Sequence, residues 1–120
     1  MGYIVDGTCK QCGYEKQSMY LGSGWCSGWY SLQTIAKFPY YCKVCEEVVV
    51  HNTVMKPAYS CGQLMVRYDD PTLSKQKSEA PHKVFSLNIG NEELVLTDND
   101  YLCPKCKGYT LRWSRVGLWD

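Results

Sequence analysis

Several short stretches of the chain alternate apolar with polar residues, which is the pattern of a half-buried β-strand. Residues 84–89 place Phe85, Leu87 and Ile89 on one face. Gly90-Asn91 supplies turn residues, and residues 93–96 resume the strand pattern. This segment is therefore predicted to form a β-hairpin.

Three further segments favour strands. Residues 109–114 alternate tyrosine, leucine and tryptophan with polar side chains, residues 48–51 are rich in β-branched valine, and residues 64–68 have a similar apolar content. Residues 31–37 fit one short helix, with Ser31 as its cap. The polar run 69–83 contains two prolines and is predicted to be an exposed loop. The fold class is mainly β with at most one short helix.

Composition points to a small domain that needs extra stabilisation. The chain has 120 residues with ten glycines, five prolines and only two phenylalanines, so one domain over 1–120 with a thin apolar core is expected. Structural zinc contributes about 10 to 16 kcal/mol of apparent binding free energy in small finger peptides, comparable to the net stability of a whole domain. A bound metal could therefore supply most of the stability.

The cysteines supply a candidate for that metal. Three Cys-x-x-Cys pairs occur, and on a tight turn each pair directs two thiolates at one point; the pairs are Cys9 with Cys12, Cys42 with Cys45, and Cys103 with Cys106. We expect Zn²⁺ at one or two sites, with iron as the less favoured metal.

No charged start followed by an apolar run opens the chain, and no apolar stretch of about 18 residues occurs. A cytoplasmic protein with reduced thiolates and no membrane contact is expected. The formal net charge is +1. Two filled four-cysteine sites would change it to about −3, because each site releases four protons and gains a dication.

Two pairs complete one tetrahedral site, so the third pair needs further ligands. Cys61 lies 15 residues after Cys45, in a sequence that resembles a knuckle whose first cysteine has become Ala58. Cys42, Cys45 and Cys61 are thus the candidate ligands of an inner site. Its fourth ligand is His51 or Cys26, or the site is degenerate and holds no metal.

The outer pairs are then assigned to one site made of Cys9, Cys12, Cys103 and Cys106. This pairing predicts an outer ribbon of residues 1–30 with 84–120, and an inner ribbon of residues 38–70 inserted within it. A sequential alternative joins the first pair to the second and leaves Cys61, Cys103 and Cys106, with Cys26 as a candidate fourth, for the other site. Spacing alone leaves both open.

The motifs Cys9-x-x-Cys12-Gly13-Tyr14 and Cys103-Pro104-x-Cys106 resemble the two knuckles of rubredoxin and of the wider zinc-ribbon class. The insertion between them is much longer than in rubredoxin, and the strongly acidic balance of that family is missing. The likeness is therefore closer to small zinc-ribbon proteins of bacteria, which implies a zinc-bound scaffold.

No phosphate-binding glycine loop, nucleophile elbow or His-Glu-x-x-His motif occurs, so no catalysis is expected. The leading hypothesis is a zinc-binding scaffold or interaction module with a protein partner. A rubredoxin-like or thiol-based redox protein is the second hypothesis. The third is a zinc ribbon that binds nucleic acid through Arg67, Arg112 and Arg115.

Overall fold

The computed structural model describes residues 2–27, 32–53, 59–60, 62–75, 81–89 and 92–119. Within these residues the fold is mainly antiparallel β, as predicted. The strands are β1 (Gly2–Cys9), β2 (Glu15–Ser27), β3 (Leu32–Cys42), β4 (Glu47–Asn52), β5 (Tyr59–Ser60), β6 (Gln63–Leu64), β7 (Val66–Arg67), β8 (Ser74–Lys75), β9 (Lys83–Ile89), β10 (Glu92–Thr97), β11 (Asp100–Leu102) and β12 (Tyr109–Trp119).

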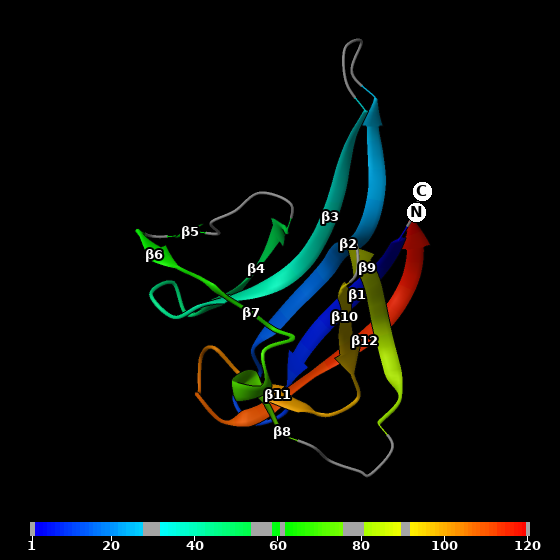
Figure 1. Cartoon of the computed structure of the whole chain (residues 1–120). Helices are drawn as coiled ribbons and strands as arrows, with labels where there is room; N and C mark the ends of the chain where they lie inside the picture. The colour runs from blue at the N-terminus through cyan, green and yellow to red at the C-terminus, as the bar shows by residue number, and fades with distance from the viewer. Residues whose placement is uncertain are drawn as a thin grey trace.

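One eight-stranded sheet contains both ends of the described chain. Its order is β4-β3-β2-β1-β12-β11-β8, and β7 also pairs with β3 (Figure 1). β1 lies between β2 and β12, with Gly2 opposite Trp119 and Cys9 opposite Leu111. This register brings the end of β1 next to the start of β12, and so brings the first and last cysteine pairs into one neighbourhood.

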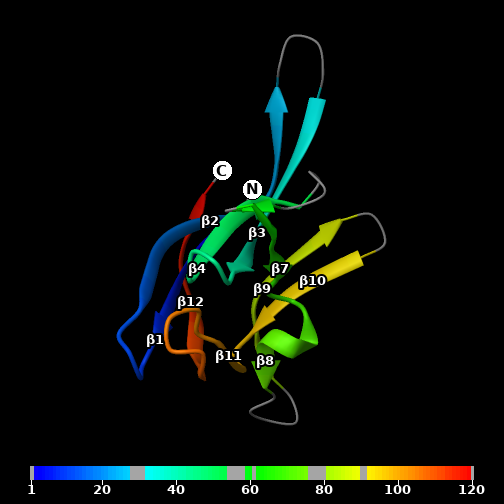
Figure 2. The same ribbon diagram turned by 90° about the vertical axis from the view of Figure 1, so that its left-hand side faces the viewer.

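The hairpin predicted from alternation is present as β9 and β10, which form a separate two-stranded sheet (Figure 2). Its Phe85 lies against Tyr3 of β1 and Phe38 of β3, with ring centroids 6.0 and 5.9 Å apart. The core thus forms between this hairpin and the large sheet.

A second group of aromatic rings joins the inner strands to the strands near the last cysteine pair. Tyr68 is completely buried, and its ring lies edge-on to Trp113 at 5.1 Å. The Tyr68 hydroxyl donates a hydrogen bond to the carbonyl oxygen of Leu102, at 2.9 Å. The segment after β7 is therefore fixed directly beside Cys103.

The predicted helix over residues 31–37 is wrong, since residues 32–37 belong to β3. They pair with residues 22–27 of β2, and this ladder overrides a weak local helix pattern. The strands predicted over 48–51 and 109–114 are present within β4 and β12. Residues 64–68 form parts of β6 and β7 rather than one strand.

The exposed loop predicted over 69–83 is wrong in its first part. A 3₁₀ turn covers Pro71–Leu73, with Asp70 as its cap, and β8 follows and pairs with β11. Leu73 is buried in the core. The described residues include no helix with the length and apolar character that crossing a bilayer requires.

Candidate metal centre

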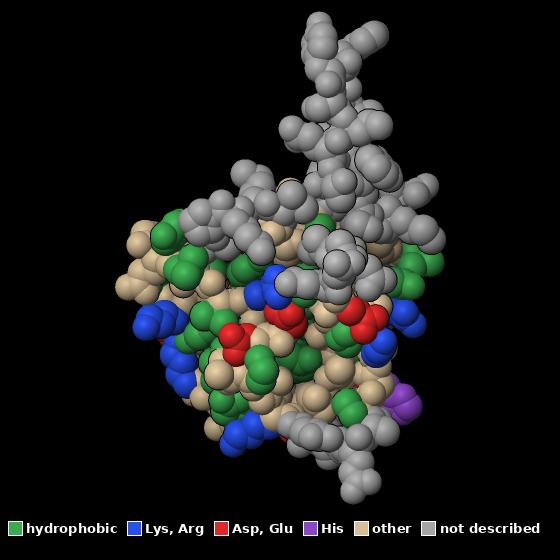
Figure 3. Space-filling view, in the orientation of Figure 1, with side chains coloured by type: hydrophobic (Ala, Val, Ile, Leu, Met, Phe, Trp, Pro, Cys, Tyr) green, Lys and Arg blue, Asp and Glu red, His purple; other side chains and the backbone are tan. Residues whose placement is uncertain are grey.

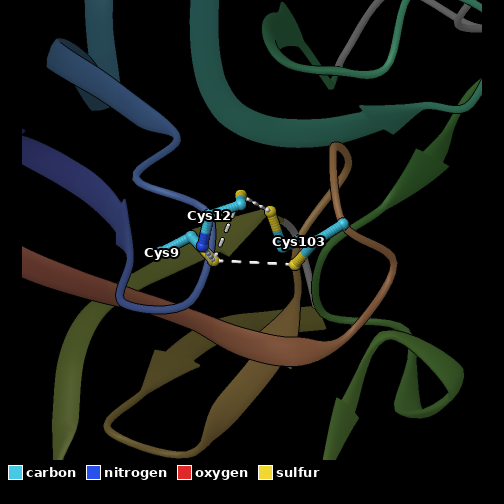
Figure 4. Close-up of side chains that lie close together, drawn as sticks. Cys9, Cys12 and Cys103 are labelled. Carbon is cyan, nitrogen blue, oxygen red and sulfur yellow. Dashed lines mark hydrogen bonds between the residues drawn. The ribbon is translucent and has the colours of Figure 1, made fainter.

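Four cysteines from the two ends of the chain form one cluster (Figure 4). Cys9 ends β1 and Cys12 lies on the turn after it, while Cys103 and Cys106 lie on the turn between β11 and β12. The four sulfur atoms all lie within 4.8 Å of one another. The geometry therefore joins the outer pairs, and the sequential pairing of the first pair with Cys42 and Cys45 is not the one observed.

The separations of these sulfur atoms fit a tetrahedral metal site. The Sγ atoms of Cys9 and Cys12 are 3.5 Å apart, those of Cys12 and Cys103 are 3.5 Å apart, and those of Cys9 and Cys106 are 3.7 Å apart. Four sulfur ligands about 2.3 Å from one zinc ion at tetrahedral angles would be about 3.8 Å apart. The cluster needs little adjustment to hold an ion of this size.

The two turns that carry these ligands have the same backbone hydrogen bonds. The amide of Cys9 donates to the carbonyl oxygen of Tyr14, and the amide of Gly13 donates to that of Cys9, at 2.8 and 3.2 Å. In the second turn the amide of Cys103 donates to Gly108, and that of Lys107 donates to Cys103, at 2.8 and 2.9 Å. We call each such turn, with its Cys-x-x-Cys pair, a knuckle.

Each knuckle requires a left-handed backbone directly after its second cysteine. Gly13 supplies this with φ +77°, and Lys107 occupies the matching position with φ +62°. A left-handed conformation costs an L residue about 1 to 2 kcal/mol, so the knuckle geometry imposes it on Lys107. The Lys107 ammonium is held by the carbonyl oxygen of Pro104 at 2.7 Å.

Thr110 interacts with two of the four sulfur atoms. Its Oγ1 lies 2.9 Å from Cys9 Sγ and 3.5 Å from Cys106 Sγ. Burial alone would raise the pKa of Cys9, but the Thr110 hydroxyl and the amides of Cys12 and Gln11 outweigh it and lower that pKa to about 6. The same hydroxyl and the amide of Gly108 lower the pKa of Cys106.

Cys103 behaves in the opposite way. Burial raises the pKa of its thiol to about 12, although the amides of Cys106 and Lys105 act against that rise. In the absence of a cation, the cluster therefore combines a thiolate at Cys9 with a protonated thiol at Cys103. A divalent metal removes this mismatch, because it displaces the proton and neutralises the gathered charge.

The donor set is closed. Four thiolates fill a tetrahedral shell and leave no position for water or substrate, which is the pattern of structural metal sites. Cys9 and Cys103 are buried, while Cys12 is exposed at the surface. This arrangement can fix the ends of β1, β11 and β12 together.

The second cysteine pair lies between β3 and β4, away from this cluster in the chain. Cys42 is buried, and the amide of Cys45 points at its Sγ from 3.4 Å. Cys45 is disulfide-bonded. The other two sequence candidates, Cys61 and the side chain of Cys26, lie outside the described residues.

His51, the other candidate for the inner site, lies on β4 opposite Phe38. Glu47 is opposite Cys42 in the same ladder, so His51 is four residues further along, or about 13 Å at the rise of a strand. The ring of His51 lies edge-on to Tyr40 at 5.4 Å. This register favours a fourth inner ligand other than His51.

Two sets of contacts were not predicted from the sequence. One is between Thr110 and the cysteine sulfur atoms, and the other joins the two cysteine turns to β3, β4 and the turn between them. The hydroxyl of Tyr14 accepts a hydrogen bond from the amide of Val48, at 2.9 Å. Lys107 Nζ lies 3.2 Å from the Tyr41 hydroxyl and 3.8 Å from a carboxylate oxygen of Glu46. The one available signal for Thr110 was its position, a hydroxyl four residues after Cys106 at the start of a predicted strand.

In comparisons with protein-family models, curated proteins and solved structures, the chain matches none of them. The site itself therefore carries the functional argument.

Proposed function

We propose that this chain is a zinc-binding scaffold of the zinc-ribbon type, whose metal fixes a β-sheet that a protein partner contacts. The observation that carries the proposal is the closed set of four cysteine sulfur atoms, all within 4.8 Å of one another. Thiolate-only tetrahedral sites are typical of structural zinc. The matching hydrogen bonds of the two knuckles support the resemblance to ribbon proteins that their sequences carry.

The arginines give little support to the nucleic-acid alternative. Arg67 is paired with Asp69 at 2.6 Å, and Arg112 with Asp100 at 3.3 Å. Arg115 lies over the ring of Tyr3 at 4.7 Å. Charges that are matched within the chain contribute less to a phosphate-binding surface. We therefore favour a protein partner.

Exposed apolar side chains around the inner strands are the best-supported surface for that partner. They come from the Cys42–Cys45 turn and from β5, β6 and β7, and they are Val44, Tyr59, Leu64 and Val66. Tyr59 and Leu64 are direct cross-strand neighbours, exposed by 59 and 62 %. Hydrophobic side chains gather at this edge in Figure 3, over the position of β5 and β6 in Figure 1.

Metal analysis of the purified chain tests the zinc claim. We expect at least one zinc ion per chain, no visible absorption, and loss of the same ion from both Cys9→Ser and Cys103→Ser in native mass spectrometry. Iron with a visible thiolate absorption would instead support the rubredoxin-like alternative. A zinc count equal to that of the wild type in either variant would contradict a shared site.

Proximity labelling in the cells in which this protein naturally occurs tests the partner surface. We expect Leu64→Ser to lose a labelled protein that the wild type and Leu118→Ser both retain. Leu118 is a matched control, since its side chain is apolar and 72 % exposed on β12. Identical labelling by all three chains would contradict this surface, and single-stranded nucleic acid recovered with the wild type would support the third hypothesis.

A further inference from the structure

A β-bulge interrupts the ladder between β1 and β12 near the two chain ends, which lie side by side in Figure 1. Ile4 pairs with Gly117, and Val5 pairs with Arg115. The residue between them on β12, Val116, has no counterpart on β1. Side chains alternate between the two faces of a strand, and an extra residue shifts that alternation by one position. Bulges often lie beside binding sites, where they redirect a side chain.

Arg115 places a cation on the face of the sheet that is turned toward the core. It lies two residues after Trp113, which is buried, and opposite Val5, which is completely buried. Beyond the bulge, Leu118 lies opposite Tyr3 and continues the same face. The side chains of Arg115 and Leu118 are exposed. The core-facing side of the sheet therefore ends in a cation and an apolar side chain that both reach solvent.

An open pocket of about 330 Å³ lies at this end of the face. The described residues that line it are Tyr3, Arg115, Gly117 and Leu118. Pockets that hold small molecules begin at about 300 Å³ and combine apolar walls with a few polar groups. Here Leu118 provides an apolar wall and Arg115 provides the charge, while Gly117 contributes only backbone. The pocket thus has the size and the composition of a site for a small ligand.

The charge of Arg115 has no carboxylate partner among the residues that the structure describes. By contrast, Arg112 on the same strand is paired with Asp100 at 3.3 Å. The guanidinium of Arg115 lies over the ring of Tyr3 at 4.7 Å. Such a ring orients the guanidinium but accepts none of its five N–H donors, which lie in the guanidinium plane. One arginine of this kind suits a single anionic group, whereas a nucleic-acid backbone presents a series of phosphates.

We propose that this pocket binds a small organic carboxylate that carries an apolar chain. The carboxylate accepts two parallel hydrogen bonds from the Arg115 guanidinium, a geometry that arginine provides and lysine does not. The apolar chain lies against Leu118 and removes its exposed surface from water. Tyr3 and Cys9 are about 20 Å apart along β1, so the pocket is separate from the four-cysteine cluster. The proposal goes beyond the proposed function.

The test is an NMR titration of the full chain, loaded with zinc, with sodium hexanoate. We expect the backbone amide signals of Tyr3, Arg115 and Leu118 to shift and to saturate. Three probes each lack part of the recognised chemistry: hexanamide has no charge, acetate has no apolar chain, and inorganic phosphate has neither a carboxylate nor a chain. Each should bind at least about tenfold more weakly than hexanoate. A hexanoate titration without saturable shifts at these amides would overturn the proposal, and so would equal binding of hexanamide.

Three variants assign the binding to Arg115. Arg115→Gln should weaken hexanoate binding about 10- to 100-fold, because the charge-assisted hydrogen bonds are lost. Arg115→Lys keeps the charge without the planar fork and should bind with intermediate affinity. Arg112→Gln is the matched control, since it removes the same charge from the opposite face of β12, and it should bind like the wild type. Unchanged binding by Arg115→Gln, or equal weakening by Arg112→Gln, would contradict the assigned site.

Discussion

The Cys9–Cys12 turn and the Cys42–Cys45 turn, which we also call a knuckle, share three structural features. Both bury the first cysteine, both direct an amide at its sulfur, and both place the next residue in the left-handed region. They differ in what completes them. The first faces Cys103 and Cys106, which the pairing of β1 with β12 brings beside it, whereas the second has its Cys45 in a disulfide.

This difference shows that a Cys-x-x-Cys turn can form from its own short sequence. A four-cysteine metal site needs more, because strand pairing must bring two such turns together. Here the ladder between β1 and β12 places Cys9 opposite Leu111, close to the turn that carries Cys106. The predictions below test how far the two regions differ, from the largest expected effect to the smallest.

The loss of one cysteine should have the most clearly different effects on stability in the two knuckles. We expect Cys9→Ser to lose zinc and most of the free energy of unfolding, because structural zinc contributes about 10 kcal/mol or more to small domains. Cys42→Ala removes a single buried sulfur atom from the core, and we expect it to cost about 1 to 2 kcal/mol. Urea denaturation of both variants, with zinc present, measures the two losses. Equal losses would mean that the two knuckles contribute alike.

Acid should open the four-cysteine cluster with a predictable sign. The pKa of Cys103 is raised to about 12, so at neutral pH zinc must displace its proton, and zinc affinity should fall as the pH falls. The pKa of Cys9 is lowered to about 6, so its thiolate persists above that pH and is lost as the pH falls through it.

We therefore expect the apparent zinc affinity to fall about tenfold per pH unit for each proton involved, and more steeply below pH 6 than above it. Competition with a chelator of known affinity between pH 8 and pH 5 measures this slope. An affinity independent of pH would contradict the assigned thiol states.

Thr110 should affect the cluster through its hydrogen bond with the sulfur atom of Cys9. Thr110→Val keeps the shape of the side chain and removes the hydroxyl, which should raise the pKa of Cys9 and weaken zinc binding about 10- to 100-fold. Thr110→Ser retains the hydroxyl and should stay close to the wild type. The same chelator competition checks both variants, and identical affinities for valine and serine would exclude this role.

The smallest effect concerns the left-handed residues. Glu46→Gly should stabilise the chain by about 0.5 to 1 kcal/mol, because glycine adopts φ +53° without the cost of a side chain. The lost ion pair with Lys107 is exposed and contributes little. Gly13→Ala should destabilise the chain, because φ is +77° at this position. Nothing lies within 4 Å of the added methyl group, so no new contact offsets this cost. Thermal unfolding of both variants gives the two signs.

The sequence was a good guide wherever spacing alone determines structure. The pairs at Cys9–Cys12 and Cys103–Cys106, the hairpin of residues 84–96 and the final strand all follow from local patterns. Segments whose conformation depends on distant partners were not predictable in this way. Residues 32–37 fit a helix by local spacing, but pairing with β2 makes them a strand.

The same reasoning explains what was missed at the site. Leu73 and the short strand β8 look like parts of a polar loop until β11 is seen beside them. Thr110 lies next to the sulfur atom of Cys9 only because the start of β12 pairs with the end of β1. Such contacts arise from the sheet register, which no local pattern specifies.

X-ray absorption at the metal edge, measured on the zinc-loaded Cys42→Ser variant, tests the central claim most directly. This variant keeps the four-cysteine cluster and removes one cysteine of the Cys42–Cys45 pair. The account predicts a single shell of four sulfur atoms about 2.3 Å from zinc. A shell with nitrogen or oxygen ligands, or fewer than four sulfur atoms, would contradict a site closed by Cys9, Cys12, Cys103 and Cys106.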